Sequence, residues 1–222
     1  MSKVITFAHP KGGVGKSMLA FNYSAYLLKK RKKFCIIDLD GQHSITNFNA
    51  IRKIYNLPNF DIKHFNESKS LIDFIQNNNY DFIVIDTGGF DSSLNRVVLA
   101  LSDVIVTPVS DSPVETLRLF DFNNILGDIA KEMKVDELKT HIVLNRIHGS
   151  VRNIESIKEP YQECKNFTFL QSVIRDRARY KFSISSGKSI FEENKNDIDE
   201  RAIEEIKKLF REIDNLVANI KE

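Results

Sequence analysis

Two lysines share a glycine-rich stretch, Lys-Gly-Gly-Val-Gly-Lys-Ser, that runs from Lys11 to Ser17. Glycines let the backbone turn its N–H groups towards an anion, and the N-terminus of a following helix adds a favourable dipole. An apolar strand is predicted before the stretch, over 3–8, and an amphipathic helix over 16–30, as phosphate-binding loops require. We therefore expect Lys16 to reach the β- and γ-phosphates of a nucleotide and the Ser17 hydroxyl to bind Mg²⁺.

Carboxylates follow two other apolar runs. The run over 34–38 ends in Asp38, and Asp40 comes two residues later, so an extended chain carries both on the same side. A third run ends in Asp86. Because ligands bind at the carboxyl ends of parallel strands, we expect Asp86 to accept a hydrogen bond from a magnesium-bound water or from Ser17.

These groups need a sheet that brings strand ends together, and the rest of the chain predicts one. Apolar runs and amphipathic stretches alternate, which indicates an α/β fold with a doubly wound, mostly parallel sheet flanked by helices. Strands are predicted at 3–8, 34–38, 60–65, 82–86, 103–107, 140–144 and 167–170. Helices are predicted at 16–30, 68–77, 92–101, 114–131, 153–164 and 197–220. We expect one domain over 1–222, with no helix-turn-helix extension before the first strand.

Composition favours a globular protein without a membrane span. Of 222 residues, 42% are hydrophobic and 28% are charged, and no apolar run reaches the roughly 18–20 residues that a span requires. No signal peptide is recognisable, so a cytoplasmic location is expected. Cys35 and Cys164 have neither a disulfide nor a metal-ligand spacing. A net charge of +2 means that any DNA contact must come from a local basic patch.

The lysine at the start of the loop resembles the deviant Walker A motif of the ParA/MinD ATPases, K-G-G-x-G-K-S/T. Pro10 stands where the ordinary P-loop has a glycine. In the family the first lysine, here Lys11, crosses the dimer interface to the nucleotide of the other subunit. The resemblance, closest to small ParA-like partition ATPases, implies catalytic roles for Lys11 and Lys16 and a P-loop NTPase fold. The implied nucleotide contacts are Lys11, Gly12, Gly13, Val14, Gly15, Lys16, Ser17 and Met18.

The segment after the second strand resembles switch I of this family, D-x-D-P-Q. Its second aspartate orients the attacking water, a role that the resemblance gives to Asp40; a solvated turn residue is the alternative. Asp38 would support the magnesium shell or the P-loop. Gly41 stands in place of the family's proline, so this segment is expected to be looser.

Asp86 begins a segment that resembles the family's Walker B and switch II, D-T-P-P. Gly88 and Gly89 replace the two prolines, which predicts a more mobile loop. The resulting magnesium candidates are Ser17, Asp38 and Asp86.

Two later segments also match the family. Asn145 follows the strand predicted over 140–144, where ParA-like proteins have an asparagine that contacts adenine; without the resemblance it is a turn residue. Residues 106–109 and Ser112–Pro113 match a strand-to-loop segment that is expected to shape the dimer surface.

The densest basic cluster lies late in the chain and resembles the I-x-x-R-x-x-Y stretch of small ParA proteins, near their DNA surface. A loop running into a helix could present its cations as a phosphate-binding strip, and a solvated charged face is the alternative. The DNA-binding candidates are Arg175, Arg177, Arg179, Lys181 and Lys188.

The resemblance implies a weak Mg²⁺-dependent ATPase that forms an ATP-dependent homodimer. Such a dimer binds DNA without sequence preference, associates with the nucleoid when ATP-bound, and is released when a ParB-like partner stimulates hydrolysis. The sequence does not identify the cargo, which can be a plasmid, a chromosome or a protein assembly. A MinD-like membrane-associated ATPase is the alternative, but the helix over 197–220 has mixed charges and is expected to close the sheet. Iron-protein reductases share the loop but need bridging cysteines, for which Cys35 is wrongly placed.

Overall fold

The computed structural model describes residues 2–112 and 114–220, so Pro113 of the expected dimer-surface segment lies outside the described residues. Seven strands form one sheet in the order β3-β2-β4-β1-β5-β6-β7. Every pairing in it is parallel, which confirms the α/β prediction and makes it stricter than "mostly parallel". The strands are β1 (Lys3–Phe7), β2 (Phe34–Asp38), β3 (Ile62–Lys63), β4 (Phe82–Asp86), β5 (Val104–Val109), β6 (Thr140–Ile147) and β7 (Phe167–Arg175).

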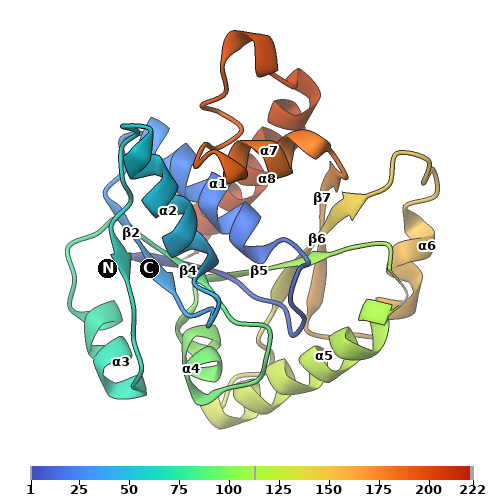
Figure 1. Ribbon diagram of the computed structural model, residues 1–222. Helices are drawn as coiled ribbons and strands as arrows, with labels where there is room; N and C mark the ends of the chain where they lie inside the picture. Colours follow the sequence, from blue (N-terminus) through green and yellow to red (C-terminus); the bar gives the residue numbers. More distant parts are fainter. Residues whose placement is uncertain (1, 113, 221–222) are drawn as a thin grey trace.

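Helices cover both faces of this sheet (Figure 1). They are α1 (Lys16–Lys29), α2 (Ser44–Ile54), α3 (Ser68–Gln76), α4 (Ser93–Leu101), α5 (Val114–Met133), α6 (Glu155–Lys158), α7 (Ala178–Ser185) and α8 (Glu200–Ala218). Alternate residues of β1 serve the two sides: Ile5 and Phe7 pack in the core beneath α1 and α8, whereas Val4 packs with α3 and α4. This two-sided burial is why the central strands β1, β2, β4 and β5 are mostly apolar and buried.

The last helix closes the sheet as predicted. Leu209, Phe210 and Ile213 of α8 are buried, and the Phe210 ring lies 5.1 Å from the ring of Tyr23 on α1. The apolar face of α8 is therefore committed to the core. Within the described part of the chain, no helix is both long and apolar enough to cross a membrane.

Two helices, α2 and α7, are absent from the sequence-based expectation. The helix α2 buries only Ile45 and Arg52, so its sequence carries little apolar periodicity. Arg52 is fully buried because its guanidinium pairs with Glu192 at 2.7 Å, a partner that the sequence does not reveal. The helix α7 lies within the basic cluster, where the density of charge hides its short helical pattern.

The other differences are in length. The predicted strand over 60–65 is reduced to β3, and the helix over 153–164 to α6 followed by a 3₁₀ turn at Glu159–Tyr161. Strands β6 and β7 extend beyond residues 144 and 170, because polar residues (Asn145 and Arg146 in β6, Gln171 and Ser172 in β7) interrupt the apolar run before each strand ends.

Candidate functional site

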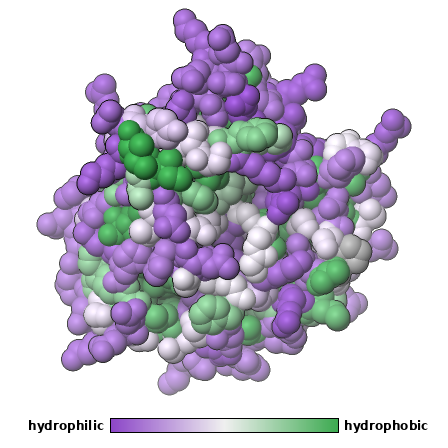
Figure 2. All heavy atoms as spheres, viewed as in Figure 1, coloured by the Kyte–Doolittle hydropathy of each residue, from purple (hydrophilic) through white to green (hydrophobic). Residues whose placement is uncertain are grey.

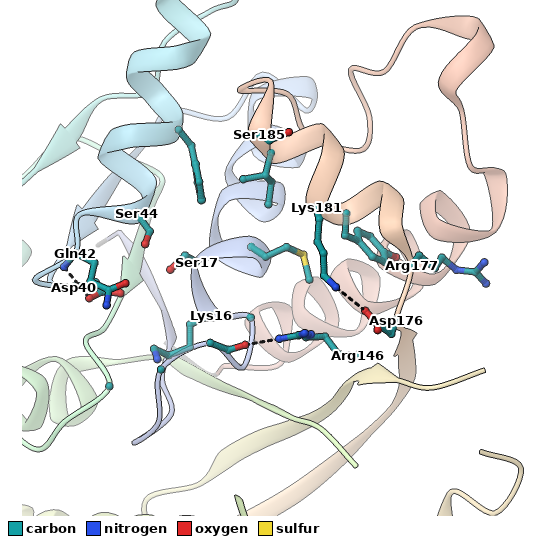
Figure 3. A pocket seen from close by; sticks show the side chains of 18 of the residues that line it. Lys16, Ser17, Asp40, Gln42, Ser44, Arg146, Asp176, Arg177, Lys181 and Ser185 are labelled. Atoms are coloured by element: carbon teal, nitrogen blue, oxygen red, sulfur yellow. Dashed lines mark hydrogen bonds and ion pairs between the residues drawn. The ribbon is translucent and has the colours of Figure 1, made fainter. Parts of the chain in front are cut away.

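The carboxyl ends of β1, β2 and β4 meet at one edge of the sheet, where the loop 11–17 follows β1. A cavity of about 920 Å³ opens there, with Lys16, Ser17 and Asp40 in its lining (Figure 3). The space-filling view shows the surface hollowed below α7 (Figure 2). One side of the cavity is lined by Gly12, Gly13 and Gly15 of the loop. The other side carries Met18, Phe48, Tyr180 and Ile184, which offer apolar surface to a planar base.

Two glycines of the loop adopt backbone conformations that other residues resist. Gly13 has φ 79° and Gly15 has φ 106°, both in the left-handed region. Gly15 also caps the N-terminus of α1, so the free N–H groups of that helix begin at the loop. The local structure is therefore that of an anion-binding site, built by the spacing of the glycines.

Lys16 is held inside this loop. Its residue is only 4% exposed, and its ammonium donates to the carbonyl oxygen of Lys11 at 3.0 Å. Burial lowers the pKa of Lys16, while the carboxylates of Asp86 and Asp40 oppose that shift. A buried ammonium with a single carbonyl partner is well placed to exchange that partner for phosphate oxygens.

Asp86 is fully buried at the end of β4, and neither of its carboxylate oxygens has a hydrogen-bond partner within residues 2–112 and 114–220. Burial raises the pKa of Asp86 to about 8, against the opposing effects of the Ser17 hydroxyl and the Lys16 ammonium. An orphaned buried carboxylate beside a hydroxyl needs a cation or a cation-bound water. The residues present therefore fit a magnesium site formed by Asp86 and Ser17.

The two switch I carboxylates diverge. Asp40 lines the cavity, and its Oδ1 accepts from the Gln42 N–H at 3.1 Å. Asp38 instead accepts from the Thr46 N–H at 3.1 Å and the Thr46 hydroxyl at 2.7 Å, in the first turn of α2. Asp38 also accepts from the Asp40 N–H at 3.2 Å. The Asp38 carboxylate thus orients the segment that carries Asp40, and its role at the magnesium shell or the loop stays a prediction.

Asn145 lies close to the phosphate-binding loop. It is fully buried, and its amide nitrogen donates to the Val14 carbonyl oxygen at 2.7 Å, beneath the loop. A Cβ on Gly15 would lie 2.3 Å from that nitrogen. Asn145 therefore supports the phosphate-binding loop through its amide nitrogen, and its contact with adenine stays a prediction. The next residue, Arg146, lines the cavity in its place and donates to the Gly13 carbonyl oxygen at 2.7 Å.

Lys11 directly precedes Gly12, which lines the cavity, and has a partner that sequence reasoning missed. Its ammonium is 3.7 Å from a carboxylate oxygen of Glu115 in the first turn of α5, and its side chain is 39% exposed. Glu115 is buried and accepts from the backbone N–H and the hydroxyl of Ser110. Nothing in the sequence distinguishes Glu115 from an ordinary acidic residue at a helix N-terminus.

The glycine pair after β4 has a steric role. A Cβ on Gly89 would lie 2.8 Å from the Gly12 nitrogen and 3.1 Å from the Lys11 carbonyl carbon. The backbone after Asp86 is therefore pressed against the backbone of the phosphate-binding loop. This contact joins the segment after Asp86 directly to the phosphate-binding loop, and it depends on glycine at position 89. The expectation of a mobile loop did not include such a contact.

The basic cluster does not form a strip of free cations. Arg177 pairs with Glu205 at 2.6 Å, Arg179 with Asp197 at 3.1 Å and Lys181 with Asp176 at 3.6 Å. Arg175 donates to the carbonyl oxygens of His148 and Val151, and the Lys188 ammonium lies 3.4 Å from the side-chain oxygen of Asn194. Several of these partners are far away in the sequence, which is why the cluster looked unopposed. Its positive charge is largely compensated within the subunit.

Comparison with known proteins agrees with this geometry. The CobQ/CobB/MinD/ParA nucleotide binding domain matches residues 5–190. An uncharacterised ATP-binding protein of Methanocaldococcus jannaschii is 30% identical over an alignment of 139 residues, and the alignment covers 49% of this chain and 52% of that protein. The match thus spans about half the length of this curated relative.

Solved structures share the fold over nearly the whole chain. A putative plasmid partition protein of Borrelia burgdorferi B31, solved with AMPPNP, has a TM-score of 0.65 at 24% identity and covers 96% of this chain and 99% of its own. A chain of the MinC:MinD cell division protein complex of Aquifex aeolicus has a TM-score of 0.68 at 17% identity, with 96% of each chain covered. Because the family domain accounts for most of its length, this chain belongs to the CobQ/CobB/MinD/ParA nucleotide-binding domain family.

Proposed function

We propose that this chain is a Mg²⁺-dependent ATPase of the ParA type, which dimerises on ATP and positions DNA or another large cargo. The observation that carries the proposal is the pair of lysines in one loop: Lys16 is buried, whereas the Lys11 side chain is 39% exposed. A partly exposed lysine can leave its ion pair with Glu115 and reach a second subunit. The likeness to a plasmid partition protein of known structure supports this choice within the family.

Different residues of the cavity bind the phosphates, hold Mg²⁺, orient the attacking water and contact the base. The N–H groups of the loop and the Lys16 ammonium bind and orient the phosphates, and Asp86 with Ser17 would hold Mg²⁺. When bound, Mg²⁺ neutralises charge on the phosphates. Asp40 reaches the cavity from switch I, where its carboxylate can accept a hydrogen bond from the attacking water and orient it. The apolar side formed by Met18 and Tyr180 takes the base.

Dimerisation would couple ATP binding and hydrolysis to cargo binding. In the free subunit Lys11 is drawn towards Glu115, and in the dimer it would exchange that carboxylate for the nucleotide of the partner subunit. The ATP-bound dimer then binds DNA without sequence preference and is released when a ParB-like activator stimulates hydrolysis. Because the cluster around Arg177 and Arg179 is internally paired, DNA phosphates must compete with Glu205 and Asp197 for these cations.

A MinD-like membrane ATPase is the competing function. It would need an amphipathic helix with an available apolar face, whereas α8 buries Leu209, Phe210 and Ile213 in the core. This observation favours a DNA-bound or protein-bound cargo over a membrane surface reached through α8.

Hydrolysis and DNA retardation test the proposal together. Wild-type protein should release phosphate slowly from ATP with Mg²⁺ and not with a chelator, and it should retard DNA of any sequence with ATP and not with ADP. Counterion release predicts that this retardation falls steeply with salt. Retardation that is independent of nucleotide would contradict the coupling of dimerisation to DNA binding, and vesicle binding without DNA binding would favour the MinD-like function.

A further inference from the structure

Three potential metal ligands converge at the two ends of the switch I segment and at the end of β3. Asp38 ends β2, His43 precedes the first residue of α2, and His64 directly follows β3. A ligand atom from each of the three lies within 4.8 Å of the other two. The rings of His43 and His64 are 5.0 Å apart between centroids and stand at 88°. Both histidines are exposed, so their side chains can close the remaining distance without disturbing the core.

The surroundings fix two of these ligands. The Asp38 carboxylate is oriented by the Thr46 N–H and hydroxyl. The Nδ1 of His64 lies 3.2 Å from the Asp38 carbonyl oxygen, an acceptor, so it is the nitrogen that carries the proton. Metal-bound histidines commonly donate their second nitrogen to a carbonyl oxygen in this way, which orients the ring.

The other nitrogen of His64 is left with a free lone pair. Its Nε2 lies 3.3 Å from the Thr46 hydroxyl oxygen, but the single hydroxyl proton of Thr46 is already donated to Asp38 at 2.7 Å. Two electron-rich atoms therefore face each other beside a carboxylate. A cation at this point would bind the lone pair of Nε2 and neutralise the charge of the carboxylate beside it.

We propose that Asp38, His43 and His64 form a binding site for a divalent transition-metal ion, best represented by Zn²⁺. Two imidazole nitrogens and one carboxylate are a common zinc ligand set, with a fourth position open to water. Mg²⁺ prefers oxygen ligands only, so this site differs from the pair Asp86 and Ser17 in the ion that it selects.

A metal ion bound to Asp38, His43 and His64 would restrict the movement of switch I. Asp40 lies between Asp38 and His43 in the chain, so an ion that joins these two residues ties both ends of the short segment that carries Asp40. Such a segment is less able to move towards the cavity. Zn²⁺ is therefore expected to slow ATP hydrolysis, a consequence that rests on the proposed function of Asp40.

The binding itself can be measured without any activity. Calorimetric titration of the nucleotide-free full chain with Zn²⁺, in the presence of excess Mg²⁺, should give one saturable site per subunit. The substitutions His43→Asn and His64→Asn should each weaken it by about tenfold or more. His148→Asn is the matched control, because His148 is also exposed but lies after β6, and it should leave the affinity unchanged.

Co²⁺ provides a second readout, since its visible absorption reports tetrahedral coordination by nitrogen and oxygen. This absorption should appear in wild type and in His148→Asn and be lost in His43→Asn. Absence of saturable binding in wild type, or equal affinity in all variants, would overturn the proposal. Hydrolysis inhibited by Zn²⁺ in wild type but not in His64→Asn would support the effect on Asp40. If wild type binds Zn²⁺ but hydrolyses no ATP, the metal site stands and the proposed function fails.

Discussion

Replacing Gly15 by alanine should destabilise the folded protein through two separate effects. The backbone at this position has φ 106°, and holding alanine there costs about 1–3 kcal/mol. The new Cβ would also lie 2.3 Å from the side-chain nitrogen of Asn145, which is fully buried and bonded to the Val14 carbonyl oxygen. Displacing that amide leaves buried polar groups unpaired, at about 1–3 kcal/mol. The sum is on the order of 2–6 kcal/mol.

Urea unfolding of single and double variants separates the two effects. Gly12→Ala is the matched control, because Gly12 has no positive φ and a Cβ there would meet no atom of the described residues within 4 Å. Its free energy of unfolding should therefore stay within about 0.5 kcal/mol of wild type. Combining Gly15→Ala with Asn145→Ala removes the clash, and the double variant should lose about 0.5–3 kcal/mol less than the sum of the singles. A free energy for Gly15→Ala equal to that of Gly12→Ala would refute the contact between the loop and Asn145.

Three further results are expected. Lys16→Ala should abolish nucleotide binding in a fluorescent-nucleotide titration, because the loop loses the cation that faces the phosphates; wild-type affinity would remove Lys16 from the site. Lys11→Ala should keep that affinity but lower the ATP-dependent dimer fraction, whereas Glu115→Gln, which frees Lys11, should raise it; equal dimer fractions would exclude the exchange of partners. Burial lowers the pKa of His9 from 6.5 to about 3, so the unfolded chain binds more protons than the native state between these values. Stability should therefore fall by about 1.4 kcal/mol per unit as pH drops below 6.5, and His9→Asn should reduce that slope in denaturant unfolding at several pH values.

The sequence was sufficient for features that depend on local pattern. The fold class followed from apolar runs that alternate with amphipathic stretches, because strands buried on both faces are apolar throughout. The placement of Asp40 and Lys16 in one cavity followed from strand ends meeting at one edge of a parallel sheet.

Features that depend on distant partners could not be predicted. Asn145 bonds to Val14, a residue 131 positions earlier, and only the fold shows that its amide lies beneath the loop. The sequence predicts a free cation at Arg177, and only the fold places Glu205 of α8 beside it. The helix α2 was missed because its buried face uses Arg52, whose charge hides the helical pattern.

Light scattering of Asp40→Ala tests the central claim most directly. This variant keeps the phosphate-binding loop and loses the carboxylate that would orient water, so it should bind ATP and stall before hydrolysis. We expect the mass of a dimer with ATP and Mg²⁺ and the mass of a monomer with ADP. A monomer with both nucleotides, or hydrolysis at the wild-type rate, would contradict the proposed ATPase cycle.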